Sequence, residues 1–443
     1  MSEKTPLMQR DSTRSVLASL ISILIGLLAG SVVILIVGLT SKNLSLSAAW
    51  EGIRLVLFGV FSTGRNAAGA LSFGFNPTNL GNMLFRATPL ILTGLSVATA
   101  YKTGLFNIGA PGQYLAGTAA TLFIALSIPV GTLPRWLIWL LAFLGGVAAG
   151  GLWGAIPGLF KSLLNINEVI SCIMSNWIAA SLVTWVFDAS SLKNIVENTK
   201  SAYVYKTTYG LVVENGTRTY VPGEGIATPK MLLDKIFPNS QVNGGILIAI
   251  AIAIVIYIVM NKTTFGYELT ACGANRHAAR YAGIKDKRNI VLSMVIAGAL
   301  SGAAGALYYL SGNTEFFWTT YQSLPAIGFN GIPVALLAIC NPIGVIFAAM
   351  FMSILDIAGL QLTNLTAYNE FITDVIIAVI VYLSAFSLVS KRWLSERQKK
   401  AAHKAAEPAP AAGTAEPAAE PAPAAGEETP AVPAAETGKE EQE

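Results

Sequence analysis

Residues 87–121, ATPLILTGLSVATAYKTGLFNIGAPGQYLAGTAAT, decide the fold, because two apolar runs flank a polar, glycine-rich interruption. Irregular backbone at membrane depth is tolerated only where protein buries it or where it lines a water-filled path. We therefore predict that Asn107 and Gln113 face a permeation route, into which a helix starting near Gly112 aims free N–H groups. The alternative is an ordinary cytoplasmic turn between two helices.

The composition around this stretch excludes an ordinary soluble protein. Of the 443 residues, 53% are hydrophobic and 12% are charged, and the mean hydropathy is +0.57, whereas soluble domains carry about 25% charged residues. Residues 401–443 hold seven prolines, nine glutamates and two lysines, so we predict a disordered tail with a charge of −7. Because the whole chain carries +4, residues 1–400 carry +11, a basic excess expected on cytoplasmic loops.

Motifs for catalysis are missing from the sequence. Three scattered cysteines and two histidines predict no disulfide framework, no metal site and no His-based catalysis. No span offers a nucleophile–base set, so we predict a transport protein and not an enzyme, with no cofactor and no nucleic-acid partner. The phosphate-binding pattern G-x-x-x-x-G-K-[ST] is absent, so any ATP must be hydrolysed by a partner.

Apolar runs long enough to cross a bilayer recur along the chain. They predict an all-α integral membrane protein with about ten transmembrane helices in a domain at residues 16–390. The stretch 51–61 carries Arg54 and is too short to cross, so we expect it to be interfacial or part of a loop. The predicted spans are residues 16–39, 86–101, 113–128, 134–159, 166–187, 245–260, 290–310, 326–340, 342–360 and 371–388.

Charge predicts the orientation of these spans in the cytoplasmic membrane. Basic residues precede the first span, which lacks a small-residue cleavage site, so we expect a retained helix with residues 1–15 in the cytoplasm. Parity then places the basic loop at 261–289 in the cytoplasm and the loop at 188–243 outside. Both termini are predicted to be cytoplasmic, including the basic segment and tail at 391–443.

A second irregular stretch, AIGFNGIPVALLAICNPIG at residues 326–344, repeats the first in miniature. Phe329-Asn330 matches Phe106-Asn107, and matching interruptions in two halves point to the central site of a transporter. The pathway hypothesis uses the two phenylalanines as apolar faces and the amides as hydrogen-bonding partners.

Ionisable and amide groups inside the spans are further candidates. A charge in hydrocarbon is expensive, so Asp356, deep in its span, is predicted to contact substrate or to tie two helices. For Glu168 and Asp374 a solvated helix end is favoured. Asn176 lies in the middle of a span, where a hydrogen bond between helices is the alternative to a place in the pathway.

Glycines recur at every fourth residue in two spans, at Gly146, Gly150 and Gly154 and at Gly298 and Gly302. Small residues at this spacing allow two helices to approach closely. They predict a tight helical bundle and say nothing about the substrate.

The loop FGYELTACGANRHAARYAGIKDKRN at residues 265–289 is the most ordered-looking polar segment. From Asn275 to Ala282 it suits a short helix closed by Gly283, with Ala278 and Ala279 on a face that another surface can approach closely. A basic membrane anchor is the alternative.

Three motifs resemble the permease subunits of bacterial ABC importers of the ribose and branched-chain amino acid class. Within this class they resemble the nucleoside permeases that work with basic-membrane-protein lipoproteins. The motifs are TPLILTGLSVATAYKTGLFNIGAPGQ at 88–113, NEVISCIMSNWIA at 167–179, and GYELTACGANRHAARYAGI at 266–284 with SGAAGAL at 301–307. The resemblance covers most of residues 80–390 and departs from the family at Pro111, where an acidic residue is usual.

The resemblance implies a vitamin B12 importer-like fold with interrupted helices, in which two permeases form one pathway. It also implies that residues 261–289 dock on the ATPase through a coupling helix. The residues assigned to this coupling interface are Gly273, Asn275, Ala278, Ala279 and Gly283. Those on segments that line the path are Phe106, Asn107, Gln113, Phe329 and Asn330.

The function implied is nucleoside import through this permease subunit. Its expected partners are an ABC ATPase, a second and different permease chain, a substrate-binding lipoprotein and the bilayer. One alternative is a permease for a simple sugar or a branched-chain amino acid. Another is an ion-coupled secondary transporter, in which Asp356 or Glu168 would be the coupling carboxylate.

Overall fold

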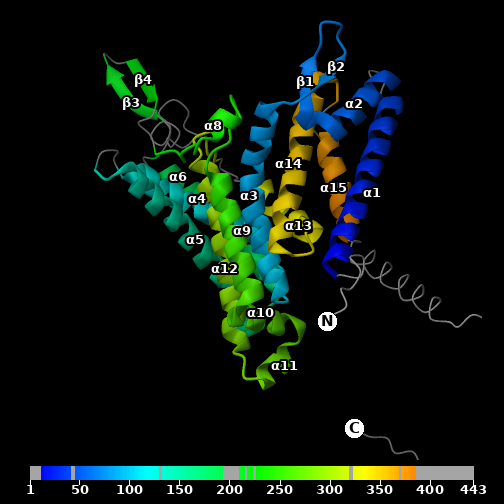
Figure 1. Cartoon of the computed structure of the whole chain (residues 1–443). Helices are drawn as coiled ribbons and strands as arrows, with labels where there is room; N and C mark the ends of the chain where they lie inside the picture. Colours follow the sequence, from blue (N-terminus) through cyan, green and yellow to red (C-terminus); the bar gives the residue numbers. More distant parts are fainter. Residues whose placement is uncertain are drawn as a thin grey trace, which may run out of the picture. The chain divides into compact units, whose positions relative to one another are not determined.

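The computed structural model describes residues 11–40, 45–128, 132–190, 192, 209–214, 217–222, 226–318, 323–368 and 371–385. Most of these residues are helical, as predicted. Figure 1 shows a bundle with the hairpin β1–β2 beyond one end and the helices α10 and α11 beyond the other. The predicted basic segment and tail at 391–443 lie outside the described residues.

The elements have the following bounds. Before the bundle core come α1 (Asp11–Thr40), α2 (Leu46–Phe58), the 3-10 turn η2 (Gly59–Phe61), β1 (Ser62–Arg65) and β2 (Leu71–Phe73). The main helices are α3 (Pro77–Lys102), α4 (Ala110–Ser127), α5 (Arg135–Leu164), α6 (Glu168–Ala189), α9 (Gly245–Lys262), α12 (Asp286–Tyr309), α13 (Ala326–Leu337), α14 (Pro342–Leu365) and α15 (Phe371–Ala385). The connecting elements are the antiparallel pair β3 (Tyr209–Glu214) and β4 (Thr217–Pro222), α8 (Leu233–Ile236), α10 (Thr264–Ala274) and α11 (Arg276–Tyr281).

Helix α3 forms the centre of the bundle. It begins at Pro77, whose missing N–H suits a first helical turn, and the Asn76 side chain accepts a hydrogen bond from the Asn79 amide at 3.1 Å. Every residue from Ala87 to Ala100 is buried, as expected of a helix that contacts α9, α12, α13 and α14 (Figure 1). The predicted span began nine residues too late, because Arg86 interrupts the apolar run and not the helix.

Helices α5 and α12 approach each other through glycine. A methyl group on Gly150 would lie 2.7 Å from the Gly302 Cα atom, and one on Gly298 would lie 3.0 Å from the Gly154 Cα atom. No side chain fits at these positions, so the two backbones are in direct contact. The tight packing predicted from the glycine spacing is confirmed.

Seven described helices are long and apolar enough to cross a bilayer, namely α1, α3, α5, α6, α9, α12 and α14. The other predicted spans correspond to α4 with 18 residues, α15 with 15 and α13 with 12. At about 1.5 Å per residue, α13 is about 18 Å long and too short to cross about 30 Å of hydrocarbon. The prediction of a full span at 326–340 is wrong, because the chain turns at Ile339 and Cys340, where φ is 49° and 53°.

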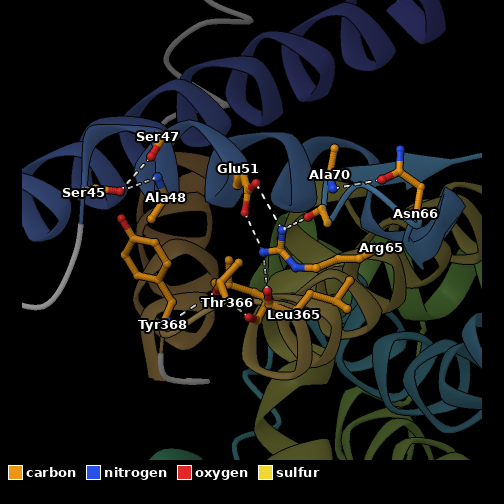
Figure 2. Close-up of polar contacts among 12 residues, drawn as sticks. Ser45, Ser47, Ala48, Glu51, Arg65, Asn66, Ala70, Leu365, Thr366 and Tyr368 are labelled. Carbon is orange, nitrogen blue, oxygen red and sulfur yellow. Dashed lines mark hydrogen bonds and ion pairs between the residues drawn. The ribbon is translucent and has the colours of Figure 1, made fainter.

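The side chain of Arg65 links the N-terminal elements to α14 through hydrogen bonds. Its Nη2 atom donates to Glu51 Oε2 of α2 at 2.7 Å and to the carbonyl of Leu365, the last residue of α14, at 2.8 Å (Figure 2). The Tyr368 hydroxyl donates to the Ile34 carbonyl of α1 at 3.2 Å. The stretch 51–61 consists of the end of helix α2 and the turn η2. Helix α2 buries one face, including Ile53, against the bundle.

Candidate translocation pathway and coupling surface

The turn between α3 and α4, residues 103–109, has a mostly buried backbone. Leu105 and Asn107 are buried and Phe106 is half-buried. Gly104 takes a φ of +75°, and its backbone lies against Gly273 of α10. The segment is thus a turn at the end of the bundle that carries α10 and α11, yet its amide side chain points into the protein. The turn between two helices is therefore present, and a permeation route along this segment stays a prediction.

Asn107 and Gln113 form a reciprocal amide pair. Asn107 Nδ2 donates to Gln113 Oε1 at 2.8 Å, and Gln113 Nε2 donates back to Asn107 Oδ1 at 3.0 Å. Asn107 also donates to Ser96 Oγ at 2.9 Å and accepts the Gly109 amide at 3.1 Å. The two side chains are 0% and 1% exposed, so these bonds satisfy groups that water does not reach. Contact of either amide with a substrate stays a prediction and requires the pair to separate.

Asn176 of α6 holds the same turn from the other side. Its Nδ2 atom donates to the Ile108 carbonyl at 3.0 Å, and its Oδ1 atom accepts the Gly112 N–H at 2.9 Å. The Gly112 N–H, predicted to point free into the route, is therefore bound within the protein. For Asn176 the sequence left a hydrogen bond between helices as the alternative to a place in the pathway. That bond is present, between α6 and α4.

The second irregular stretch differs from the first in its local structure. Phe329 and Asn330 lie inside helix α13, half-buried, and the real break in the chain follows at residues 338–341. The prediction that the two Phe-Asn pairs mark equivalent interruptions is therefore wrong. The stretches do meet, because a methyl group on Gly328 would lie 2.7 Å from the Pro111 nitrogen in the first turn of α4.

The intramembrane acidic residues fall into two kinds. Glu168 begins α6 and pairs with Lys161 Nζ at 2.9 Å, so the helix-end interpretation is confirmed. Asp356 is half-buried in α14, where the guanidinium of Arg86 is near enough to attract it electrostatically. Arg86 was missed in the sequence because it was placed at a helix start. The Asn76-Pro77 start pattern would have put it about two and a half turns inside α3.

The loop between α9 and α12 folds as two short helices. Asn275 begins α11 by accepting the Ala278 amide at 3.0 Å, and Gly283 ends the turn with a φ of +82°. Arg276 Nε and Arg280 Nη2 both donate to Asp286 Oδ2, at 2.7 and 2.9 Å, which holds α11 against the start of α12. The hydrogen bond to Asp286 raises the pKa of Arg280 and keeps it charged. The predicted short helix closed by glycine is confirmed.

The residues predicted at the coupling interface are not equally accessible. Asn275, Ala278 and Gly283 are exposed, whereas Ala279 is 4% exposed and packs inside its own chain. Gly273 lies against the backbone of residues 102–104, so its small size serves contact within this chain. Tyr281 is 95% exposed at the end of α11. Tyr281 lies on the predicted short helix but is not among the residues predicted at the coupling interface.

Comparison with known proteins agrees with this architecture. Residues 79–384 match the family described as branched-chain amino acid transport system / permease component. The chain is 32% identical over 387 residues to the guanosine ABC transporter permease protein NupP of Bacillus subtilis, covering 87% of this chain and 98% of that protein. It is 34% identical over 375 residues to the nucleoside ABC transporter permease protein NupB of Lactococcus lactis, covering 84% and 92%.

Weaker similarity extends to two further permeases. The glucose ABC transporter permease protein TsgB13 of Haloferax volcanii is 29% identical over 314 residues, or 71% of this chain and 78% of that protein. A second guanosine permease of Bacillus subtilis, NupQ, is 25% identical over 270 residues, or 60% and 77%. The chain is therefore similar to two guanosine permeases of Bacillus subtilis, and its sequence identity is higher to NupP than to NupQ.

Proposed function

The chain belongs to the family of branched-chain amino acid transport system / permease components, and from this premise we propose that it is the permease subunit of an ATP-driven nucleoside importer. The observation that carries the substrate class is the identity of 32% and 34% to a guanosine and a nucleoside permease over most of the chain. The protein is a multi-pass membrane protein, and its relatives are transport subunits.

The arrangement we propose has ten membrane helices in a vitamin B12 importer-like fold within residues 16–390. The seven long apolar helices are joined by α4, α13 and α15, and α13 reaches only part of the way through the bilayer. Both termini and residues 261–289 are cytoplasmic and residues 188–243 are outside. The arginines and lysines at the end of α9, on α11 and at the start of α12 support this orientation.

Coupling to ATP hydrolysis runs through α10 and α11 on a partner ATPase. The exposed side chains of Asn275, Ala278 and Tyr281 form the contact, and Gly283 completes the turn. Ala279 and Gly273 act by packing α11 and α10 against the rest of the permease. The ion pairs of Arg276 and Arg280 with Asp286 make α11 move with α12 as one unit.

A second permease completes the pathway, and a substrate-binding lipoprotein delivers the nucleoside. The similarity of the chain to both NupP and NupQ supports a partner permease that is a different chain. The pathway residues are Phe106, Asn107, Gln113, Asn176, Phe329, Asn330 and Asp356. Of these, the buried amides of Asn107, Gln113 and Asn176 hold the α3–α4 junction, and half-buried Phe106, Phe329 and Asn330 are the better placed to meet substrate.

The proposal is tested with the whole transporter in proteoliposomes. ATP-dependent uptake of tritiated guanosine should be competed by inosine, and excess free ribose, glucose or leucine should leave it unchanged. Competition by glucose equal to that by inosine would favour the sugar class, to which TsgB13 belongs by its description. Uptake that needs no ATPase but follows an ion gradient would overturn the ABC mechanism.

A further inference from the structure

Two residues of opposite charge lie inside the bundle on neighbouring helices. Arg86 stands nine residues after Pro77, the start of α3, and Asp356 stands nine residues before Leu365, the end of α14. At about 1.5 Å per residue, each is about 13 Å from the end of its helix, which is well inside a bilayer about 30 Å thick.

Strand β1 joins these two helix ends. Asn76 Nδ2, just before α3, donates to the Ser62 carbonyl of β1 at 2.7 Å. Arg65, at the other end of β1, donates to the Leu365 carbonyl at 2.8 Å (Figure 2). Helices α3 and α14 pack against each other, and Arg86 is near enough to Asp356 to attract it electrostatically.

The surroundings of the two side chains are unusual for charges at this depth. Both residues are half-buried, so part of each residue is accessible from outside this chain. Neither has a hydrogen bond or a direct ion pair with any residue that the structure describes. Glu168, in contrast, forms a direct ion pair with Lys161. Because a charge facing lipid tails is expensive, the accessible side of Arg86 and Asp356 must face water or protein.

We propose that Arg86 and Asp356 border the water-filled path through the transporter and bind the hydroxyl groups of the sugar of its substrate. This inference rests on the proposed nucleoside import. A guanidinium donates hydrogen bonds and a carboxylate accepts them, so the two together suit adjacent hydroxyls that do both. The charge of Arg86 offsets that of Asp356, which suits an uncharged ligand that must be released again, and Asp374 of α15 adds a like charge near Asp356.

The first test asks which side of α14 meets water. Asp356→Cys is compared with Phe347→Cys, which is nine residues away and so on the opposite face of the helix, where Phe347 is 68% exposed. The three native cysteines are buried, so they give little background. A water-soluble, membrane-impermeant thiol reagent should modify Asp356→Cys about tenfold faster or more, as expected if a charged group there faces water. Equal rates at the two positions would overturn the proposal.

The second test asks whether the pair contacts the sugar. Arg86→Gln and Asp356→Asn should each raise the KM for guanosine uptake about tenfold, the effect of one or two lost hydrogen bonds. Each variant should also lose the wild-type preference for guanosine over 2′,3′-dideoxyguanosine. A purely structural pair would instead be rescued by the exchange of Arg86→Asp with Asp356→Arg, and full rescue of KM would overturn sugar contact.

The two tests separate this inference from the proposed function. Thiol modification does not depend on which substrate is carried, so it tests the pathway even if guanosine is not transported. Absence of guanosine uptake by the unmodified transporter would refute the nucleoside function. Normal discrimination against the dideoxynucleoside by both variants would refute only the role of the pair.

Discussion

The backbone of Gly104, in the turn after α3, lies against the backbone of Gly273 in α10, so that a methyl group on Gly104 would be 3.1 Å from the Gly273 Cα atom. The first glycine is three residues before Asn107, and the second is two residues before Asn275, the cap of the coupling helix α11. The contact joins the segment before the coupling helix directly to the turn that carries the buried amide of Asn107. A displacement of α10 by a partner must therefore press on the α3–α4 turn.

The first prediction concerns this contact. Gly104→Ala should destabilise the protein more than Gly69→Ala, although both positions have positive φ values, of +75° and +77°. The left-handed backbone costs about 1–2 kcal/mol at each site. Only Gly104 is crowded, because nothing lies within 4 Å of a methyl group at Gly69. Crowding should add about 1–3 kcal/mol at Gly104. Thermal unfolding in detergent measures the difference, and equal melting temperatures would contradict the contact.

The second prediction separates buried amides from accessible ones. Asn107→Ala removes the partner of Gln113, Ser96 and the Gly109 amide, so it should cost about 1–3 kcal/mol for each buried group left unpaired. Asn330→Ala is the matched control, since Asn330 is half-buried and makes no hydrogen bond within the described residues. We expect Asn107→Ala to lower the melting temperature and Asn330→Ala to raise the KM at unchanged stability. The reverse pattern would show that Asn107 is the substrate ligand.

The third prediction tests the glycine contact of α5 and α12. Gly150→Ala places a methyl group 2.7 Å from the Gly302 Cα atom, whereas at the next residue, Gly151, the nearest atom is the Val295 carbonyl oxygen at 3.3 Å. Overpacking should cost about 1–3 kcal/mol in the first variant, and the second should be close to neutral. Unfolding in detergent and the yield of inserted protein report the result. A neutral Gly150→Ala would mean that these helices are not packed as described.

The sequence predicted the helical membrane architecture because long apolar runs and glycine spacing are local signals. It also predicted α11, since Asn275 and Gly283 are strong start and stop residues. It could not predict the length of α13, because the break at Ile339 and Cys340 uses residues with no turn preference. Nor could it predict that Asn176 binds Gly112, because that pairing depends on how α4 and α6 face each other, or that Asn107 binds Gln113, because that pairing depends on the backbone path of the turn between them.

The last prediction concerns the exposed aromatic ring at the coupling surface. Tyr281 is 95% exposed at the end of α11, and Tyr267 is 71% exposed on α10. An aromatic side chain that fills a pocket on a partner typically contributes about 2 kcal/mol or more to binding, which is roughly 30-fold in affinity. Tyr281→Ala should therefore raise the ATPase concentration needed for half-maximal assembly by roughly 30-fold.

Tyr267→Ala is the matched control for this variant and should change assembly little, because the side chains proposed to contact the ATPase all lie on α11 or its cap and none on α10. Assembly is measured by titrating detergent-purified permease with the ATPase, and coupling by nucleoside-stimulated ATP hydrolysis in proteoliposomes. Both variants should insert and melt like the unchanged protein, since neither ring is buried. If Tyr281→Ala assembles normally and Tyr267→Ala does not, the docking surface lies on α10. In that case the exposed residues of α11 would have no part in binding the ATPase.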